Sequence, residues 1–96
     1  MINLNFDSIA LTQSLVKCAS ITPDNAGTLN IIEDHLKHLG FNSTRLPFSG
    51  NDSYRVDNLF ATIGSKGKHL AFAGHTDVVP PGNEASWKFP PFEGII

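Results

Sequence analysis

His75 and Asp77 are the residues whose types and spacing are best suited to chemistry. They lie near the end of the run HLAFAGHTDVV at 69–79, which stays apolar between His69 and His75 and is typical of a strand covered on both faces. Side chains two residues apart on a strand share a face, so the imidazole and the carboxylate are expected to project side by side, with Thr76 opposite. Ligands of open α/β sheets bind at the carboxyl ends of strands, which makes this pair a candidate site.

Three interpretations of the pair remain open on spacing alone. His75 can ligate a metal while Asp77 orients its ring, an arrangement that metal-bound histidines commonly need. The two can belong to a nucleophilic triad, although no Ser or Cys stands in the context of a nucleophile elbow. The pair can also be purely structural, with the imidazole satisfied by a buried carboxylate.

Two other patterns resemble sites but favour simpler interpretations. His35 and His38 have a spacing that can chelate a metal on a helix, yet His35 lies at the flank of the apolar face and His38 points away from it. A solvated surface pair is therefore preferred. The segment 64–67, Gly-Ser-Lys-Gly, lacks the full phosphate-loop pattern and a following helix, which favours a hairpin turn.

Two helices are predicted ahead of the strands. The first begins at Asp7 or Ser8 and ends near Cys18. Thr22-Pro23-Asp24 is typical of a helix start, because proline is tolerated in the first turn. The second helix then runs to Gly40, a suitable left-handed C-cap, and one apolar face is formed by Leu29, Ile32, Leu36 and Leu39.

After Gly40 the apolar period changes from 3.6 to 2, which predicts three strands. They cover residues 41–48 with a break at Pro47, residues 54–63, and residues 68–79. The expected fold class is therefore α/β, two N-terminal helices followed by strands of a mixed sheet. The loop at 80–92 carries proline pairs and the aromatic residues Trp87, Phe89 and Phe92, which either line a pocket beside the strand end or cover the sheet.

Composition narrows the class of protein. The chain has 96 residues, 7 Lys+Arg against 9 Asp+Glu, and a net charge of -2 without runs of either sign, which argues against nucleic acid and acidic membranes as partners. Cys18 is the only cysteine, which excludes a disulfide framework and favours a reducing, cytoplasmic location. No segment has the length of a membrane span or the pattern of a secretory signal.

Several segments resemble one known family. The run 71–82, AFAGHTDVVPPG, resembles the first metal motif of the dinuclear zinc hydrolases, a family that contains desuccinylases, acetylornithine deacetylases, aminoacylases and glutamate carboxypeptidases. The Pro-Pro-Gly at 80–82 and the spacing from Trp87 to Pro90-Pro91-Phe92 resemble most closely the succinyl-diaminopimelate desuccinylases of that family, as does SITPDNAG at 20–27. The order of elements agrees along the whole chain.

The resemblance implies roles for the pair. His75 would be a zinc ligand, and Asp77 the catalytic acid that orients it. Two zinc ions, which cobalt can replace, would activate a water that hydrolyses the small-molecule substrate N-succinyl-LL-2,6-diaminopimelate to succinate and LL-2,6-diaminopimelate, a step of lysine biosynthesis.

The resemblance also implies what lies outside these residues. Residues 1–96 would form the N-terminal part of the catalytic domain, without the inserted dimerisation domain that makes the complete enzyme a homodimer. The bridging aspartate, a Glu-Glu pair, a further acidic ligand and a second histidine ligand would all follow Ile96. We therefore expect these 96 residues alone to be inactive and to bind zinc weakly at most.

Two alternatives stay open. An enzyme of the same family that resembles acetylornithine deacetylase would share His75 and Asp77 but remove another acyl group. A different class of protein, a non-catalytic remnant or interaction module, would use exposed sheet edges to bind a partner.

Overall fold

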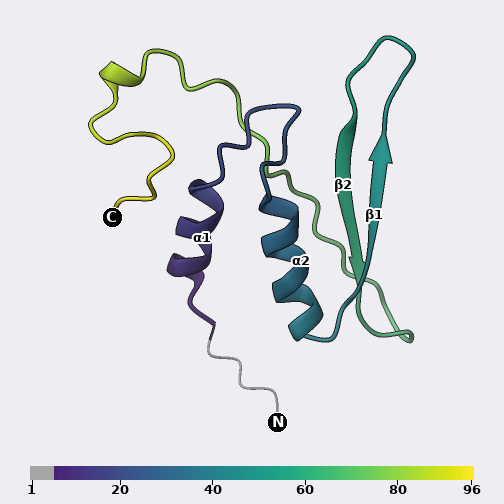
Figure 1. Cartoon of the computed structure of the whole chain (residues 1–96). Coiled ribbons are helices and arrows are strands. Elements are labelled where there is room, and N and C mark those ends of the chain that lie inside the picture. The colour runs from purple at the N-terminus through teal and green to yellow at the C-terminus, as the bar shows by residue number, and fades with distance from the viewer. Residues whose placement is uncertain (1–5) are drawn as a thin grey trace.

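The computed structural model describes residues 6–96 as two α-helices, a two-stranded antiparallel sheet and a long C-terminal loop that contains a short 3₁₀ helix at Glu84–Ser86. Helix α1 spans Ser8–Val16 and helix α2 spans Thr28–His38. Helix α2 contacts α1 on one side and both strands on the other, so α1, α2 and the hairpin lie side by side in that order (Figure 1). The predicted α/β class, with helices followed by strands, is confirmed.

Helix α1 begins where the sequence predicts. The Asp7 carboxylate accepts hydrogen bonds from the amides of Ile9 and Ala10, at 3.0 and 3.1 Å, so Asp7 rather than Ser8 is the N-cap. Such a cap pairs amides that the first turn leaves without helical partners.

Helix α2 begins later than the Thr-Pro-Asp signal predicts. Its N-cap is Gly27, in the left-handed region at φ +91°. The Asp24 and Asn25 side chains instead accept hydrogen bonds from the amides of Ala26 and Gly27, at 2.8 and 2.9 Å. These local bonds satisfy the backbone in a turn and compete with helix formation, so residues 22–27 remain a loop. The C-terminal prediction is confirmed, because Gly40 follows the C-cap Leu39 at φ +92°.

Strands β1 (Asn42–Phe48) and β2 (Val56–Thr62) pair from Asn42 opposite Thr62 to Phe48 opposite Val56. The predicted break at Pro47 is wrong, because Pro47 lies within β1 opposite Asp57. A strand paired on one side only has alternate amides that face away from its partner, and proline is tolerated at such positions.

The third predicted strand, at 68–79, is not formed. Its only ladder contact among the described residues is an isolated parallel bridge between Ile21 and Val78. Residues 68–77 otherwise run as an extended chain with Leu70 83% and Phe72 92% exposed, so the 64–67 turn does not lead into a paired strand. An apolar run becomes a strand only where another strand supplies backbone partners, and residues 6–96 supply none beyond that bridge.

The core of the described residues is thin. Leu29 is its buried apolar residue, at 7% exposed, and Ser20 and Thr28 are its buried polar residues, at 3% and 1%. The described helices include none long and apolar enough to cross a membrane. The buried residues lie on α2 and the loop before it, which is the region that meets residues 76–78.

Candidate metal-binding corner at His75 and Asp77

The structure places His75 and Asp77 in direct contact. The His75 Nδ1 atom lies 3.1 Å from Oδ1 of Asp77 and 3.0 Å from the Asp77 backbone carbonyl oxygen. These contacts engage one ring nitrogen and leave Nε2 on the other side of the ring. The side chain of His75 is 82% exposed and that of Asp77 is 44% exposed, so the pair is open to solvent.

The second carboxylate oxygen of Asp77 is held by a residue from the loop between the helices. The Thr22 hydroxyl donates to Oδ2 of Asp77 at 2.7 Å. This hydrogen bond is the main cause that lowers the pKa of the Asp77 carboxyl, and the contact with His75 acts in the same direction, while partial desolvation opposes both. Asp77 is thus a carboxylate at neutral pH, with each oxygen engaged.

The backbone around the pair is held in place by the same loop. The Val78 amide donates to the Ser20 carbonyl at 2.9 Å, and the Thr22 amide donates to the Val78 carbonyl at 3.0 Å. The Ser20 hydroxyl donates to the Thr76 carbonyl at 2.8 Å.

A hydroxyl pair adds a further link on the face away from His75. The Thr28 hydroxyl lies 2.9 Å from the Thr76 hydroxyl and 2.8 Å from the Asn25 carbonyl. Thr76 therefore faces α2, while His75 and Asp77 face solvent, as the alternation of a strand predicts.

Sequence reasoning missed the four residues of this support, namely Ser20, Thr22, Thr28 and Thr76. The available signal was the alternation of Ser20 and Thr22, which indicates an extended segment with hydroxyls on one face. Their partners lie 48 to 56 residues away along the chain, which no local pattern reveals.

The donor set fits one corner of a metal site. Within residues 6–96, no three or more His, Cys, Asp or Glu side chains cluster closely enough to hold a metal. A catalytic zinc ion typically takes three protein ligands. His75, with a carboxylate behind it, has the form of a single ligand with its orienting acid.

The histidine pair of α2 is a separate candidate region. His35 and His38 are exposed, and each ring contacts a carbonyl of its own helix, His35 that of Ile31 at 2.9 Å and His38 that of Asp34 at 2.7 Å. Their exposure agrees with the surface pair expected from the sequence. Within the described residues, no third ligand lies close enough to form a cluster with them.

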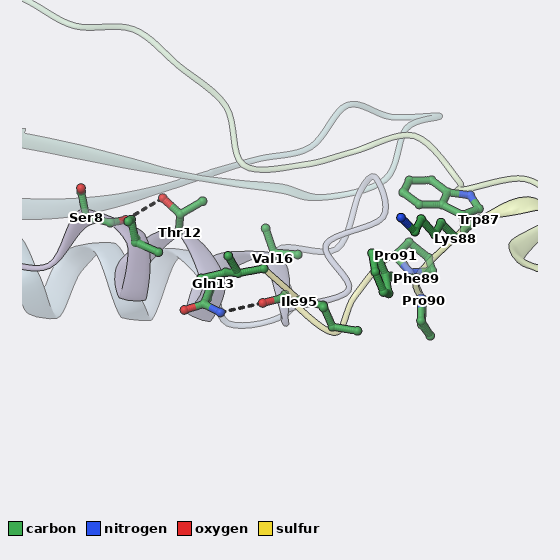
Figure 2. A pocket seen from close by; sticks show the side chains of 13 residues that line it. Ser8, Thr12, Gln13, Val16, Trp87, Lys88, Phe89, Pro90, Pro91 and Ile95 are labelled. Carbon is green, nitrogen blue, oxygen red and sulfur yellow. Dashed lines mark hydrogen bonds between the residues drawn. The ribbon is translucent and has the colours of Figure 1, made fainter.

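The aromatic loop packs against α1 rather than beside His75 or over the sheet. Trp87 and Phe89 line an open cavity of about 530 Å³ whose other wall is α1, including Ile9 and Val16 (Figure 2). A hydrogen bond of 2.7 Å from the Gln13 side chain to the Gly94 carbonyl joins the loop to the helix. In Figure 1 this loop lies on the far side of α1 from the hairpin.

Comparison with known proteins supports the resemblance seen in the motifs. No family model matches the chain. Succinyl-diaminopimelate desuccinylases of Bradyrhizobium sp. (strain ORS 278) and Rhodospirillum centenum are each 50% identical to it over 90 residues, and that of Nitrobacter hamburgensis is 47% identical over 90 residues. In each case the match covers 94% of this chain and 23% of the relative, so the chain spans about a quarter of the relatives' length. Over nearly all of its residues, the chain is therefore homologous to succinyl-diaminopimelate desuccinylases.

Proposed function

We propose that the chain forms the N-terminal part of the catalytic domain of a succinyl-diaminopimelate desuccinylase and supplies one corner of its metal centre. The contact between His75 Nδ1 and the Asp77 carboxylate is the observation that carries this proposal. It presents Nε2 to solvent from a ring whose orientation is already set, which is the form a metal-ligating histidine takes. The names of relatives at about 50% identity support the choice of reaction.

The proposed reaction is hydrolysis of the amide in N-succinyl-LL-2,6-diaminopimelate. The water oxygen bonds to the succinyl carbonyl carbon, the C–N bond breaks, and the nitrogen leaves with a proton, which yields succinate and LL-2,6-diaminopimelate. Zinc, or cobalt in its place, would polarise the carbonyl and make the water acidic. His75 would bind one metal ion through Nε2, and Asp77 would hold the opposite edge of the ring.

The proposal also covers the activity of the chain alone and the assembly of the complete enzyme. One ligand corner is insufficient for a catalytic zinc site, so we expect the 96-residue chain alone to release no succinate. The complete enzyme would supply the other ligands and a dimerisation domain, and would act as a cytoplasmic homodimer. The lone cysteine supports that location.

The direct test replaces the matching 90 residues of the Bradyrhizobium (strain ORS 278) desuccinylase with those of this chain. The chimera is expected to release succinate, and His75→Ala is expected to lose one metal ion and most of the activity. Asp77→Ala should keep more metal but lose about 10-fold or more in metal affinity or rate, as substitutions behind a metal ligand do. Thr44→Val, on an exposed face of β1, serves as the control.

Metal content and activity together decide the outcome. A folded chimera in which His75→Ala retains full metal occupancy would overturn the ligand assignment. A chimera that cleaves N-acetylornithine in preference to the succinylated substrate would instead favour the acetylornithine deacetylase alternative.

A further inference from the structure

We propose that Thr22 is a positioning residue that orients the Asp77 carboxylate and thereby keeps the His75 hydrogen on Nδ1, with Nε2 free as a lone-pair donor. The inference rests on the proposed function for its purpose, because a bare Nε2 is what a metal ligand requires. The hydrogen bonds on which it rests join only residues of this chain. It assigns a role to a residue that precedes the pair by more than fifty positions.

The location of the ring hydrogen follows from the two groups that face Nδ1. One is the Asp77 carbonyl oxygen at 3.0 Å and the other is Oδ1 of the Asp77 carboxylate at 3.1 Å. Both are acceptors that carry no hydrogen, so Nδ1 must donate. A neutral imidazole has a single ring N–H, and therefore Nε2 carries the lone pair.

Thr22 determines which way the carboxylate turns. A free Asp side chain rotates about its terminal torsion, which is broad and weakly restricted. The Thr22 hydroxyl at 2.7 Å from Oδ2 restrains that rotation and leaves Oδ1 directed at His75. Thr22 is itself well placed, since its amide donates to the Val78 carbonyl at 3.0 Å and its β-branched side chain has few rotamers.

The positioning role is separable from support of the fold. The buried hydroxyls that hold residue 76 belong to Ser20, which donates to the Thr76 carbonyl, and to Thr28, which contacts the Thr76 hydroxyl. The two residues are 3% and 1% exposed. Thr22 is exposed. Its hydroxyl also lies 3.2 Å from the Val78 carbonyl, but that carbonyl keeps the Thr22 amide as a donor when the hydroxyl is removed. Removing only the hydroxyl of Thr22 is therefore expected to leave the fold intact while releasing the carboxylate.

Nitrogen NMR of the His75 ring tests the proposal in the 96-residue chain without metal, at a fixed pH of about 8, where imidazole is mostly neutral. In the unchanged chain, the ¹⁵N shifts should show Nδ1 protonated and Nε2 unprotonated. Thr22→Val should move the two shifts toward each other, because the carboxylate is free to rotate away from Nδ1 and only the Asp77 carbonyl then remains to hold the hydrogen there. Thr22→Ser retains a hydroxyl and should restore the original shifts, and Thr44→Val is the matched control away from the pair.

Backbone amide spectra report whether each variant remains folded, so a loss of structure is recognised separately from a change of tautomer. Ring shifts that are the same in Thr22→Val as in the unchanged chain would overturn the proposal. It would also be overturned if Thr22→Ser, with its amide spectrum intact, behaved as Thr22→Val does.

A zinc titration of the desuccinylase chimera separates this inference from the proposed function. Thr22→Val is expected to weaken zinc binding by up to about 10-fold, with Thr22→Ser near the unchanged affinity. If the ring shifts respond to Thr22→Val but the chimera takes up no zinc, the positioning role stands and the proposed function fails. If the chimera binds zinc and the ring shifts do not respond, the positioning role fails alone.

Discussion

The unit formed by α2 and the β1–β2 hairpin, residues 28–62, and the extended segment at 68–75 both carry apolar side chains and backbone groups that need partners. The backbone groups of the α2–hairpin unit find partners locally, because the helix bonds within itself and each strand lies opposite the other. The extended segment has no ladder partner among the described residues and leaves Leu70 and Phe72 almost fully exposed. Elements with nearby partners fold from their own sequence, whereas a strand with distant partners depends on the rest of the fold.

The two regions meet at one junction, residues 76–78. There the loop before α2 supplies two backbone bonds and the hydroxyls of Ser20 and Thr22, and the first residue of α2 supplies the hydroxyl of Thr28. The candidate pair His75–Asp77 therefore lies where the unsupported segment first gains support. This position explains how an exposed pair acquires a defined geometry.

The largest expected effect comes from Leu29→Ala in the α2–hairpin unit. Leu29 is 7% exposed, and removing a buried leucine side chain typically costs about 2–3 kcal/mol or more of unfolding free energy. Urea denaturation followed by circular dichroism measures the loss. Leu70→Ala, at a position that is 83% exposed, is the matched control and should change stability by less than about 0.5 kcal/mol. Equal losses in the two variants would contradict the distinction between the regions.

A smaller loss of unfolding free energy is expected from Thr28→Val, which tests how residues 76–78 are held. The substitution preserves shape but removes a buried hydroxyl that contacts the Asn25 carbonyl and the Thr76 hydroxyl. The free energy of unfolding should fall by about 1–2 kcal/mol, because these groups each lose a hydrogen-bond partner. Hydrogen exchange at the Val78 amide should accelerate, because its bond to Ser20 belongs to the same junction. An unchanged exchange rate at Val78 would show that residues 76–78 are held without α2.

The pH dependence of the α2–hairpin unit should come in part from Glu33. Its side chain is 16% exposed, and its pKa is lowered mainly by a hydrogen bond from Ser43, with Arg45 and Lys37 nearby. A carboxyl with a lower pKa in the folded state stabilises the fold above its unfolded pKa and loses that contribution as the pH falls through the folded value. Stability should therefore fall below a pH of about 4.5.

Glu33→Gln is the matched variant for this prediction. It should flatten the acid side of the curve and should cost less at neutral pH than Thr28→Val, since partly exposed ion pairs contribute little. Chemical denaturation at a series of pH values measures both effects. A curve for Glu33→Gln that parallels the unchanged chain would exclude Glu33 as a source of the pH dependence.

The smallest effect on stability is expected from Phe72→Ser in the extended segment. Phe72 is 92% exposed, so the change should alter the unfolding free energy by less than about 0.5 kcal/mol. Binding of a hydrophobic fluorescent dye should decrease, because an exposed aromatic side chain is removed. Phe41→Ser, at a half-buried position after α2, should destabilise the chain instead. A loss at Phe72 as large as that at Phe41 would show that the segment is packed in solution.

Local patterns predicted the elements whose partners are close in sequence. The apolar stripe and Gly40 identified α2, and the change of period after Gly40 identified β1 and β2. The same approach placed the start of α2 too early, because the side chains of Asp24 and Asn25 bond to the turn rather than to a helix. It also predicted a strand at 68–79, since an apolar run indicates burial without saying which segment covers it.

For the candidate site, the sequence by itself determined the juxtaposition of His75 and Asp77, because residues two apart in an extended chain necessarily project to one side. The motifs of the sequence also resemble those of succinyl-diaminopimelate desuccinylases, and a relative of that name is 50% identical over 94% of the chain. Only the tertiary structure showed that Thr22 holds the far oxygen of Asp77, and that Ser20 and Thr28 bond to the carbonyl and the hydroxyl of Thr76 beside it. Those contacts join residues about fifty positions apart, and the folding of the loop before α2 onto residues 76–78 is what brings them within hydrogen-bonding distance.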